Sequence, residues 1–416
     1  MSTEVREPSA KYLIQAQCKD TEIGPIPSDW KIKRLRDISP NQSVGLVINP
    51  STYFDLRGTV PMLVGSNVTE NRIDWEGARR IARDSNERLP ASRVYTDDLV
   101  TVRVGDPGVT AVVSKEYSGS NCASMMIVRS HPSFDSNWLC YLMNSSYGRS
   151  RIESVQYGTA QKQFNISDAI EFKYPVPPLP EQRAIAAALS DVDALIAGLE
   201  KLIAKKRDLK QAAMQQLLTG QTRLPGFSGE WKVKRLGEIC EISMGRTPSR
   251  LNPAFWGAGH VWLSIADLHG KVLSSSKEQI TPLGASSMRL IPKGTLLMSF
   301  KLSIGRLCFA GCDLYTNEAI CGFNNLLANS DYLYYALSCT DFSLYGKQAV
   351  KGYTLNKKSL ALVEVPLPSN EEQAAIANVL SSMDAELSDV ENRLAKTRDL
   401  KQGMMQELLT GRTRLV

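Results

Sequence analysis

The sequence predicts an α+β protein with two mixed α/β domains, two long coiled-coil-like helices and an internal repeat. A duplication is the first reason: residues 181–224 and 372–415 align without a gap at a constant offset of 191, and 26 of their 44 positions are identical. Second, both copies carry apolar residues at helical spacing. Third, strand-like alternation and turn residues fill the stretch before each copy. The extent of identity indicates a true duplication, so the chain consists of two related halves.

Each copy of the duplicated segment is expected to form one helix. Its apolar residues alternate at spacings of three and four, which is the seam that one helix presents to a partner helix. The seam breaks before Leu209 and Leu400, so the helices should pair without a perfect heptad repeat. Gly220 and Gly411 stand where a C-terminal cap is expected. A helix of about 38 residues spans roughly 57 Å, which suits a spacer. The seam residues are Leu189, Val192, Ile196, Leu199 and Ile203, and Leu380, Met383, Leu387, Val390 and Leu394.

The chain has the composition of an ordinary soluble protein. Its 416 residues suffice for two or three domains, and no apolar run approaches the ~18 residues of a membrane span. Residues 1–20 lack the apolar region of a signal peptide. Eight scattered cysteines without a C-x-x-C pair indicate reduced thiols, so we expect a cytoplasmic protein without a disulfide or zinc framework.

The net charge of +6 lies mainly outside the duplicated helices. Those two segments hold 13 of the 49 basic and 12 of the 43 acidic residues, which leaves 36 basic and 31 acidic residues elsewhere. A modest excess of this kind favours a nucleic-acid partner only if it is clustered on one face.

The two halves are expected to share one order of elements. Each opens with a turn and a strand-like segment, residues 26–38 and their echo at 227–239. Proline pairs then precede each long helix, because proline stops one element and sets the start of the next. The echoes between the two bodies pair residues 60–68 with 260–268, 99–103 with 296–301, 121–123 with 317–319, and 161–165 with 352–356. The predicted boundaries are a lead-in at 1–20, domains at 21–180 and 223–368, and helical spacers at 181–222 and 369–416.

Over nearly its whole length, from about Ile26 to Val416, the chain resembles the DNA-specificity (S) subunits of type I restriction-modification systems. The most specific signs are the P-x-P…E-Q segments before both helices, the L-L-T-G-x-T-R-L ends, and T-P-S-R-x-N-P-x-F-W-G at Thr247–Gly257. The resemblance implies two target recognition domains that are separated by two long antiparallel helices in a pseudo-twofold arrangement. Each domain would read half of a split double-stranded DNA site. The resemblance also implies helices that dock two modification (methyltransferase) subunits, with restriction (motor-nuclease) subunits completing the complex. S-adenosylmethionine, ATP and Mg²⁺ would then belong to the partners only.

No enzyme active site or metal site is predicted in this chain. Asn252–Phe255 is near the N-P-P-F/Y loop of adenine methyltransferases, but it lacks the second proline, and no Gly-rich cofactor loop follows a strand. Glu171 and Lys173 form an E-x-K triplet, with Asp168 too close for a two-strand nuclease site. A P-loop is also missing. We expect these segments to be structural.

The candidate DNA-binding residues are polar side chains near strand ends and loops of the two bodies. Arg103 and Lys301 are favoured because both end a strand at corresponding places, although any one candidate could be an ordinary solvated residue. An arginine-rich stretch at 72–93 is interspersed with acids and is predicted to be a solvated helix face rather than a phosphate track. The candidates are Asn67, Arg103, Gln161 and Lys162 in the first body, and Asp267, Lys301, Arg306, Lys351 and Tyr353 in the second.

Both long helices retain an identical R-D-L-K-Q segment. Because these identical residues are polar and lie on a helix that is expected to be exposed, they suggest that each helix offers the same docking surface to one of two copies of a partner subunit. The alternative is that the residues are identical only because the two halves arose by duplication. The docking candidates are Arg207, Asp208, Lys210 and Gln211, and Arg398, Asp399, Lys401 and Gln402.

The sequence therefore favours a non-catalytic specificity subunit that reads a bipartite DNA target and directs methyltransferase and endonuclease/translocase subunits. Two rivals remain: a coiled-coil assembly adaptor that does not bind DNA, and a self-contained DNA methyltransferase. A specificity subunit should lose affinity for duplex DNA steeply as the salt concentration rises, whereas the adaptor should not. Binding of S-adenosylmethionine by the chain alone would support the second.

Overall fold

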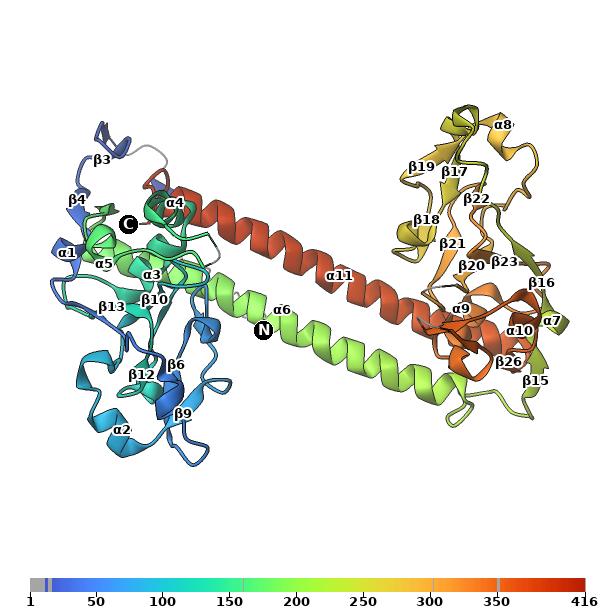
Figure 1. Ribbon diagram of the computed structural model, residues 1–416, viewed down its shortest axis with the longest axis horizontal. Coiled ribbons are helices and arrows are strands. Elements are labelled where there is room, and N and C mark those ends of the chain that lie inside the picture. Colours follow the sequence, from blue (N-terminus) through green and yellow to red (C-terminus); the bar gives the residue numbers. More distant parts are fainter. Residues whose placement is uncertain (1–11, 14–16, 160, 302, 350–351, 416) are drawn as a thin grey trace, which may run out of the picture. The chain divides into compact units, whose positions relative to one another are not determined.

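The computed structural model describes residues 12–13, 17–159, 161–301, 303–349 and 352–415 (Figure 1). The chain divides into two compact units. Unit 1 comprises Met1–Glu200 and Asn392–Val416, and unit 2 comprises Lys201–Glu391. Each unit contains one mixed α/β body and a part of each long helix, which confirms the predicted α+β class. Among the described residues, none of the helices combines the length and apolar content that crossing a bilayer requires, and no disulfide is formed.

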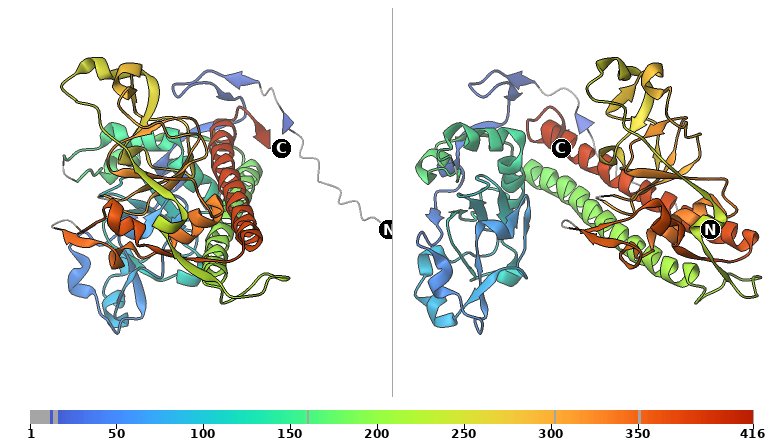
Figure 2. Two further views of the ribbon diagram at one scale, coloured as in Figure 1. Left: turned by 90° about the vertical axis from the view of Figure 1, so that its right-hand side faces the viewer. Right: turned by 45° about the vertical axis from the view of Figure 1, so that its right-hand side comes forward.

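The two long helices are α6, Leu179–Leu218, and α11, Asn370–Leu408. The side-chain amide of Gln182 donates to Pro177 O and that of Gln373 donates to Pro368 O, both at 2.9 Å, which ties each helix start to the preceding proline segment. Gly220 and Gly411 have φ of +71° and +74° after the last turns, the left-handed cap conformation that the sequence predicted. Within each unit the segments of α6 and α11 lie side by side and run antiparallel, as Figure 2 also shows.

The body of unit 1 is built on two small sheets. A four-stranded antiparallel sheet has the order β11-β10-β13-β5, and a three-stranded sheet has the order β12-β6-β9. A further antiparallel pair, β4 with β14, lies next to the start of α6 in the sequence. The strands are β4 Lys31–Arg34, β5 Gln42–Val44, β6 Val60–Leu63, β9 Arg79–Ile81, β10 Leu99–Val102, β11 Thr110–Val112, β12 Asn121–Cys122, β13 Met125–Val128 and β14 Lys173–Val176.

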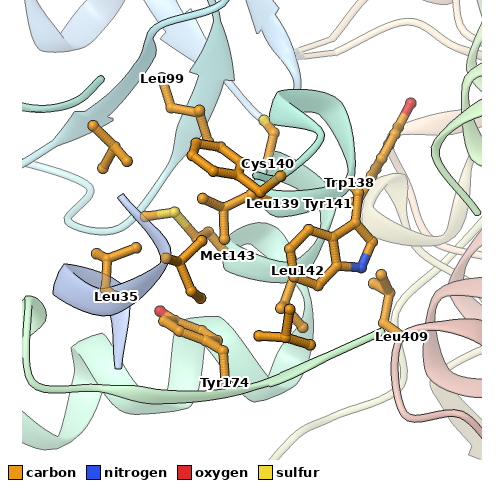
Figure 3. Packing of buried hydrophobic residues seen from close by; sticks show 14 of the residues in the cluster. Leu35, Leu99, Trp138, Leu139, Cys140, Tyr141, Leu142, Met143, Tyr174 and Leu409 are labelled. Carbon is orange, nitrogen blue, oxygen red and sulfur yellow. The ribbon is translucent and has the colours of Figure 1, made fainter. Parts of the chain in front are cut away.

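The main core of unit 1 lies between the four-stranded sheet and two helices. These helices are α3, Ser136–Asn144, and α4, Ser146–Val155. Eight of the nine residues of α3 are buried, because apolar side chains cover most of its circumference. Leu99 of β10, Leu139 of α3 and Leu409 after α11 all belong to this cluster (Figure 3). The end of the second long helix is therefore part of the first body's core.

Unit 2 repeats this architecture. Its five-stranded sheet has the order β16-β23-β20-β21-β18, its three-stranded sheet has the order β19-β17-β22, and β15 pairs with β26. The helix α9, Ser330–Ser338, covers the core as α3 does in unit 1. The strands are β15 Lys232–Arg235, β16 Glu241–Met244, β17 Trp256–Leu263, β18 Val272–Leu273, β19 Glu278–Ile280, β20 Leu296–Ser299, β21 Leu307–Ala310, β22 Tyr315–Thr316, β23 Ile320–Asn324 and β26 Glu364–Leu367.

Short elements complete the two units. They include the pairs β1–β27, β2–β3, β7–β8 and β24–β25 and five one-turn helices. Their bounds are β1 Tyr12–Leu13, β27 Arg414–Leu415, β2 Cys18–Lys19, β3 Ile26–Pro27, β7 Val68–Thr69, β8 Arg72–Ile73, β24 Lys347–Ala349, β25 Gly352–Thr354, α1 Leu35–Ile38, α5 Ile166–Ala169, α7 Leu236–Ile239, α8 Pro282–Ala285 and α10 Lys357–Ala361.

The strand pairings show which residues of the two bodies correspond, and they correct one of the matches predicted from the sequence. In both bodies a parallel pair forms, β6 with β12 and β17 with β22. The amide that follows the second strand of each pair donates to the last residue of the first strand, from Ala123 N at 2.8 Å and from Asn317 N at 2.9 Å. Ala123 therefore corresponds to Asn317. The expected match of 121–123 with 317–319 was wrong by two residues, because an N-x-A pattern occurs by coincidence in both segments.

The arginine-rich stretch at 72–93 is not a helix face, so that prediction was wrong. Its first part forms the strands β8 and β9, and only the five residues of α2, Arg83–Glu87, are α-helical, followed by a 3-10 turn at Pro90–Ser92. β9 pairs antiparallel with β6 and buries Ile81 completely. Ladder hydrogen bonds to β6 and burial of this one apolar side chain outweigh the helical propensity of the arginines.

A buried carboxylate at the start of α6 fixes the C-terminal residues in unit 1. Arg414, only 7% exposed, donates to Glu181 at 2.7 Å and to Asp29 at 2.9 Å. Trp30 Nε1 donates at 3.0 Å to Glu181 Oε2, the oxygen that also accepts from Arg414 Nη2. Hydrogen bonds to Glu181 raise the pKa of Arg414 above its ordinary value, so the guanidinium stays charged. In unit 2, Arg223 makes the matching bidentate contact with Glu372, at 2.6 and 2.7 Å.

Removing the Arg414 side chain should destabilise unit 1 strongly. The variant Arg414→Ala leaves Glu181 buried without its counter-charge, and breaking a buried pair in this way costs about 3–5 kcal/mol. Urea unfolding followed by tryptophan fluorescence measures the loss. The neighbouring Arg412→Ala removes an exposed pair with Glu407 at 3.7 Å and should change the free energy of unfolding by less than ~0.5 kcal/mol. Equal effects of both substitutions would contradict the assigned role.

Candidate nucleic-acid interface

A pocket of about 740 Å³ lies in the body of unit 2, where several chain segments end. The turn after β17, the end of β20, the loop after β22 and the segment after β25 all contribute to its wall. Its lining residues are Ser264, Ile265, Ala266, Lys301, Asn317, Glu318, Ala319 and Leu355. All four echo segments of the second body thus meet at one place.

Backbone hydrogen bonds hold the polar residues of this pocket in position. Phe300 N donates to Ala319 O at 3.0 Å, and Leu355 N donates to Phe300 O at 3.3 Å. Lys301 follows directly and is exposed. On the facing loop, the hydroxyl of Thr247 donates to the carboxylate of Glu318. This hydrogen bond, with a smaller contribution from Lys301, lowers the pKa of Glu318, so the carboxylate is ionised at neutral pH.

Two predicted DNA-binding residues instead close turns inside the bodies. Asn67 is 6% exposed, and its Oδ1 accepts the Val64 amide at 3.0 Å. Asp267 is 4% exposed and accepts the Ser264 amide at 2.8 Å and the Lys277 amide at 2.9 Å. Buried oxygens whose acceptor sites are already filled are unavailable to a duplex. Both residues therefore take a structural role, which corrects the expectation for them.

The remaining candidates of the first body lie close to one another. Arg103 is half-buried, and its Nε donates to Phe164 O at 3.4 Å. Gln161 and Lys162 are exposed, and Gly105 N donates to Lys162 O at 3.1 Å, which brings their loop beside the turn that follows Arg103. In the sequence these residues are almost 60 positions apart, and the fold places them on one edge of the body.

In the second body, Lys301 and Arg306 flank one tight turn and are both exposed. Arg306 N donates to the Ser299 hydroxyl at 3.1 Å, which closes the turn. Tyr353 lies in strand β25, and Lys351 lies outside the described residues. Sequence reasoning did not single out Glu318 or the exposed Arg246. Arg246 could have been singled out from the sequence, because it is a charged residue that follows a strand and lies next to the Thr247–Gly257 motif.

The segments that resemble catalytic motifs have structural roles in the described part of the chain. Asn252 Oδ1 accepts the Ala254 amide at 3.1 Å, which caps a single 3-10 turn. Glu171 pairs with Arg34 at 3.0 Å, and Lys173 pairs with Glu22 at 2.5 Å. No cluster of three or more potential metal ligands occurs among the described residues.

The docking candidates on the long helices divide into two groups. The first group forms ion pairs within the helix pair itself. In unit 1, Lys401 contacts Asp193 at 2.6 Å, and Tyr141 donates its hydroxyl to the same carboxylate at 2.8 Å. Burial, followed by the hydrogen bond to Asp193, raises the pKa of Tyr141, so the phenol remains a donor.

Unit 2 holds the same arrangement, with the lysine and the aspartate displaced by 191 positions and the tyrosine by 194. Lys210 pairs with Asp384, and the Tyr335 hydroxyl donates to Asp384 at 2.6 Å. A second matched set is more exposed: Arg398 contacts Glu200 at 2.7 Å in unit 1, and Arg207 contacts Glu391 at 2.6 Å in unit 2. Internal pairing therefore accounts for the arginine and lysine of the repeated R-D-L-K-Q segment.

The second group points outward. Asp208, Gln211, Asp399 and Gln402 are exposed, and so are Leu209 at 53% and Leu400 at 58%. The two leucines lie outside the seam, because Lys210 and Lys401 occupy the inward positions there. The exposed surface of each helix at this segment thus consists of an aspartate, a leucine and a glutamine.

Comparison with known proteins identifies two copies of one domain. The sequence model of the type I restriction modification DNA specificity domain matches residues 27–206 and 228–397, which together make up most of the chain. The two copies coincide with the two halves that the internal repeat defines.

Relatives extend over the whole chain. A putative type I restriction enzyme specificity subunit of Methanocaldococcus jannaschii, MjaX, is 24% identical over 97% of this chain and 98% of its own length. A second specificity subunit of that organism, MjaIX, is 35% identical over 39% of this chain and 40% of its own length. The solved S subunit of a type I restriction-modification system from M. genitalium has 16% identity and a TM-score of 0.58, and covers 91% of this chain and 96% of that one. A structure described for assembly of the type I R-M system gives a TM-score of 0.60 at 19% identity, covering 93% and 99%. These two structures share the fold.

The inward ion pairs should contribute more to stability than the exposed ones. Lys210 and Asp384 are 23% and 27% exposed, whereas Arg207 and Glu391 are 62% and 43% exposed. A double-mutant cycle with Lys210→Ala and Asp384→Ala should give a coupling energy of about 1 kcal/mol, and the matched cycle at Arg207 and Glu391 less than ~0.5 kcal/mol. Thermal unfolding of the six variants checks this. A larger coupling for the exposed pair would show that solvent exposure does not rank them.

Proposed function

The chain belongs to the family of type I restriction-modification DNA specificity subunits, and on this premise we propose that it binds a bipartite duplex DNA target and directs partner subunits to it. Each body reads one half of the target, and neither body carries out chemistry. The duplication carries this proposal, since two copies of one DNA specificity domain in a single chain provide two reading surfaces.

Two different half-sites are supported by a contrast within the structure: the long helices and their ion pairs match in the two units, whereas the loop residues of the two bodies differ. The matched ion pairs and the matched helix starts keep the frame equal in both units. The polar residues at the ends of corresponding strands differ, as Arg103 and Lys301 illustrate. Side chains at base edges specify sequence, whereas the frame only positions them. Divergent loops on an equal frame are thus suited to an asymmetric target.

The helices supply the proposed docking surface for the partners. Each presents the same exposed residues once, Asp208 and Gln211 on α6 and Asp399 and Gln402 on α11. Two equivalent surfaces suit two modification (methyltransferase) subunits, and restriction (motor-nuclease) subunits join the assembly. In this proposal S-adenosylmethionine, ATP and Mg²⁺ bind to the partners, and the complex acts in the cytoplasm.

Deleting this chain from its host should abolish methylation at one split DNA motif. Methylation mapping of genomic DNA, with co-purification of a methyltransferase subunit, tests the proposal in the intact cell. Exchanging one body for that of a relative should change one half of the motif only. Methylation that persists unchanged after deletion would contradict the proposal.

Duplex binding distinguishes a DNA-reading subunit from a coiled-coil adaptor. A protein that makes 6–10 phosphate contacts loses about 10³- to 10⁵-fold in affinity between 50 and 200 mM salt. We expect a loss of this order for the purified complex on a random duplex, whereas an adaptor would bind the duplex weakly at both salt concentrations.

The helices are also proposed to set the distance between the half-sites. DNA presents the same face every ~10.5 base pairs, so a fixed separation selects one spacer length. Inserting one helical turn into both α6 and α11 should change the preferred spacer and leave both half-site sequences as they are. Methylation mapping in cells that carry the insertion measures both quantities, and altered half-sites would exclude a ruler role.

A further inference from the structure

The pocket of unit 2 presents a cation and a carboxylate from two different loops. Lys301 extends from the end of β20, and Glu318 extends from the loop between β22 and β23. Both side chains line the pocket, and both residues are exposed. They form no direct ion pair with each other within the described residues, although Lys301 is close enough to lower the pKa of Glu318.

The carboxylate is held in a defined orientation. Thr247 donates its hydroxyl to Glu318 Oε2, and the loop itself is fixed by the hydrogen bond from Asn317 N to the end of β17. On the other side, Arg246 N donates to Thr316 O at 2.8 Å. An ionised carboxylate accepts at two oxygens, so the hydrogen bonds from Thr247 and from the Glu318 backbone amide leave acceptor capacity on a side chain that lines the pocket.

The corresponding surface of the first body carries different chemistry. Ala123 N and Asn317 N donate to the last residues of β6 and β17, so the residues that follow them, Ser124 and Glu318, match. Ser124 has φ of +55° and carries a hydroxyl where unit 2 has a carboxylate.

The neighbouring position differs as well. Leu46 N donates to Cys122 O at 2.8 Å, as Arg246 N does to Thr316 O, so a leucine stands where unit 2 has an arginine. A cation follows the corresponding strand in both bodies, but Arg103 comes directly after β10, whereas Lys301 comes one residue later, after Phe300. Different side chains at matched backbone positions are expected where the two bodies discriminate different ligands.

A lysine beside a carboxylate matches one base pair better than the others. In the major groove, guanine presents the O6 and N7 acceptors and its partner cytosine presents the N4 amino donor. An ammonium group donates to the first, and an ionised carboxylate accepts from the second. An A·T pair offers the carboxylate the adenine N6 amino group, but its thymine O4 and methyl group give the lysine a poorer partner.

We propose that Lys301 and Glu318 together read one G·C base pair in the half-site of the second body, with Lys301 donating to guanine and Glu318 accepting from the N4 amino group of cytosine. The assignment rests on the proposed DNA-reading function and adds to it the identity of one base pair and of the two side chains that select it. In the first body, Arg103 and Ser124 provide a cation without a carboxylate, so that body does not read a pair in this way.

The test uses the full chain in complex with its co-purified modification subunits and duplexes that carry the mapped target. Each base pair of the target is replaced in turn by the three alternatives, and affinity is measured for the wild type, Lys301→Met and Glu318→Gln. Both variants should reduce discrimination at the same single G·C position by about 10- to 100-fold, because a good base contact contributes that much. Lys293→Ala, an exposed cation before β20, is the matched control and should leave the profile unchanged.

Base analogues locate the contact at the atomic level. Replacing the guanine by 7-deazaguanine removes the N7 acceptor and should weaken binding of the wild type but not of Lys301→Met. Inosine lacks only the minor-groove amino group and should have no effect on either. Thermal unfolding shows whether the variants are folded, and retained discrimination at the other base pairs shows it independently.

Three results would overturn the assignment. The variants could keep the wild-type profile, they could affect two different base pairs, or they could weaken all sequences equally, as phosphate contacts do. If the wild-type complex discriminates among duplexes and the variants discriminate in the same way, only the assignment of these two residues is refuted, and the proposed function stands. A wild-type complex that shows no sequence preference refutes the proposed function and the assignment with it.

Discussion

The structure depends on a buried glutamate at the first turn of each long helix. Glu181 and Glu372 are 4% and 1% exposed, and an arginine from the L-T-G-x-T-R-L segment neutralises each of them. A carboxylate at this depth is tolerated only when it is paired and hydrogen-bonded. Because Arg414 follows the end of α11 while Glu181 begins α6, this pair requires the two helices to be antiparallel within unit 1. Arg223 and Glu372 impose the same condition in unit 2.

Ion pairs continue this arrangement along the helices. Where the apolar seam breaks, Lys401 and Lys210 turn inward and meet an aspartate and a tyrosine of the same unit. A leucine seam tolerates shifts in register, whereas a charged pair with a hydrogen-bonded third partner accepts one register only. The duplicated helices thus combine an apolar seam, in which Leu199, Ile203 and Leu394 are buried, with charged pairs that specify the register. This equal frame allows the two bodies to differ in their loops without altering how each is attached.

The candidate interface follows from the same division. Loops at the ends of β17, β20 and β22 meet at a pocket whose shape the ladders fix. Side chains there are charged in unit 2 and mostly uncharged in unit 1, although the backbone hydrogen bonds are the same. The fold therefore acts as a constant support, and the chemistry of recognition resides in a few exposed residues.

The sequence by itself determined the duplication, the two long helices, their glycine caps and the α+β class, because these depend on local spacing and on comparison of the chain with itself. It could not show that Asn67 and Asp267 are buried, that residues 72–93 form strands, or that Lys210 meets Asp384 at a distance of 174 positions. Those outcomes depend on which distant segments satisfy a backbone ladder or a buried charge. Only the tertiary structure decided them, because local spacing does not encode the partner that a polar group finds across the fold.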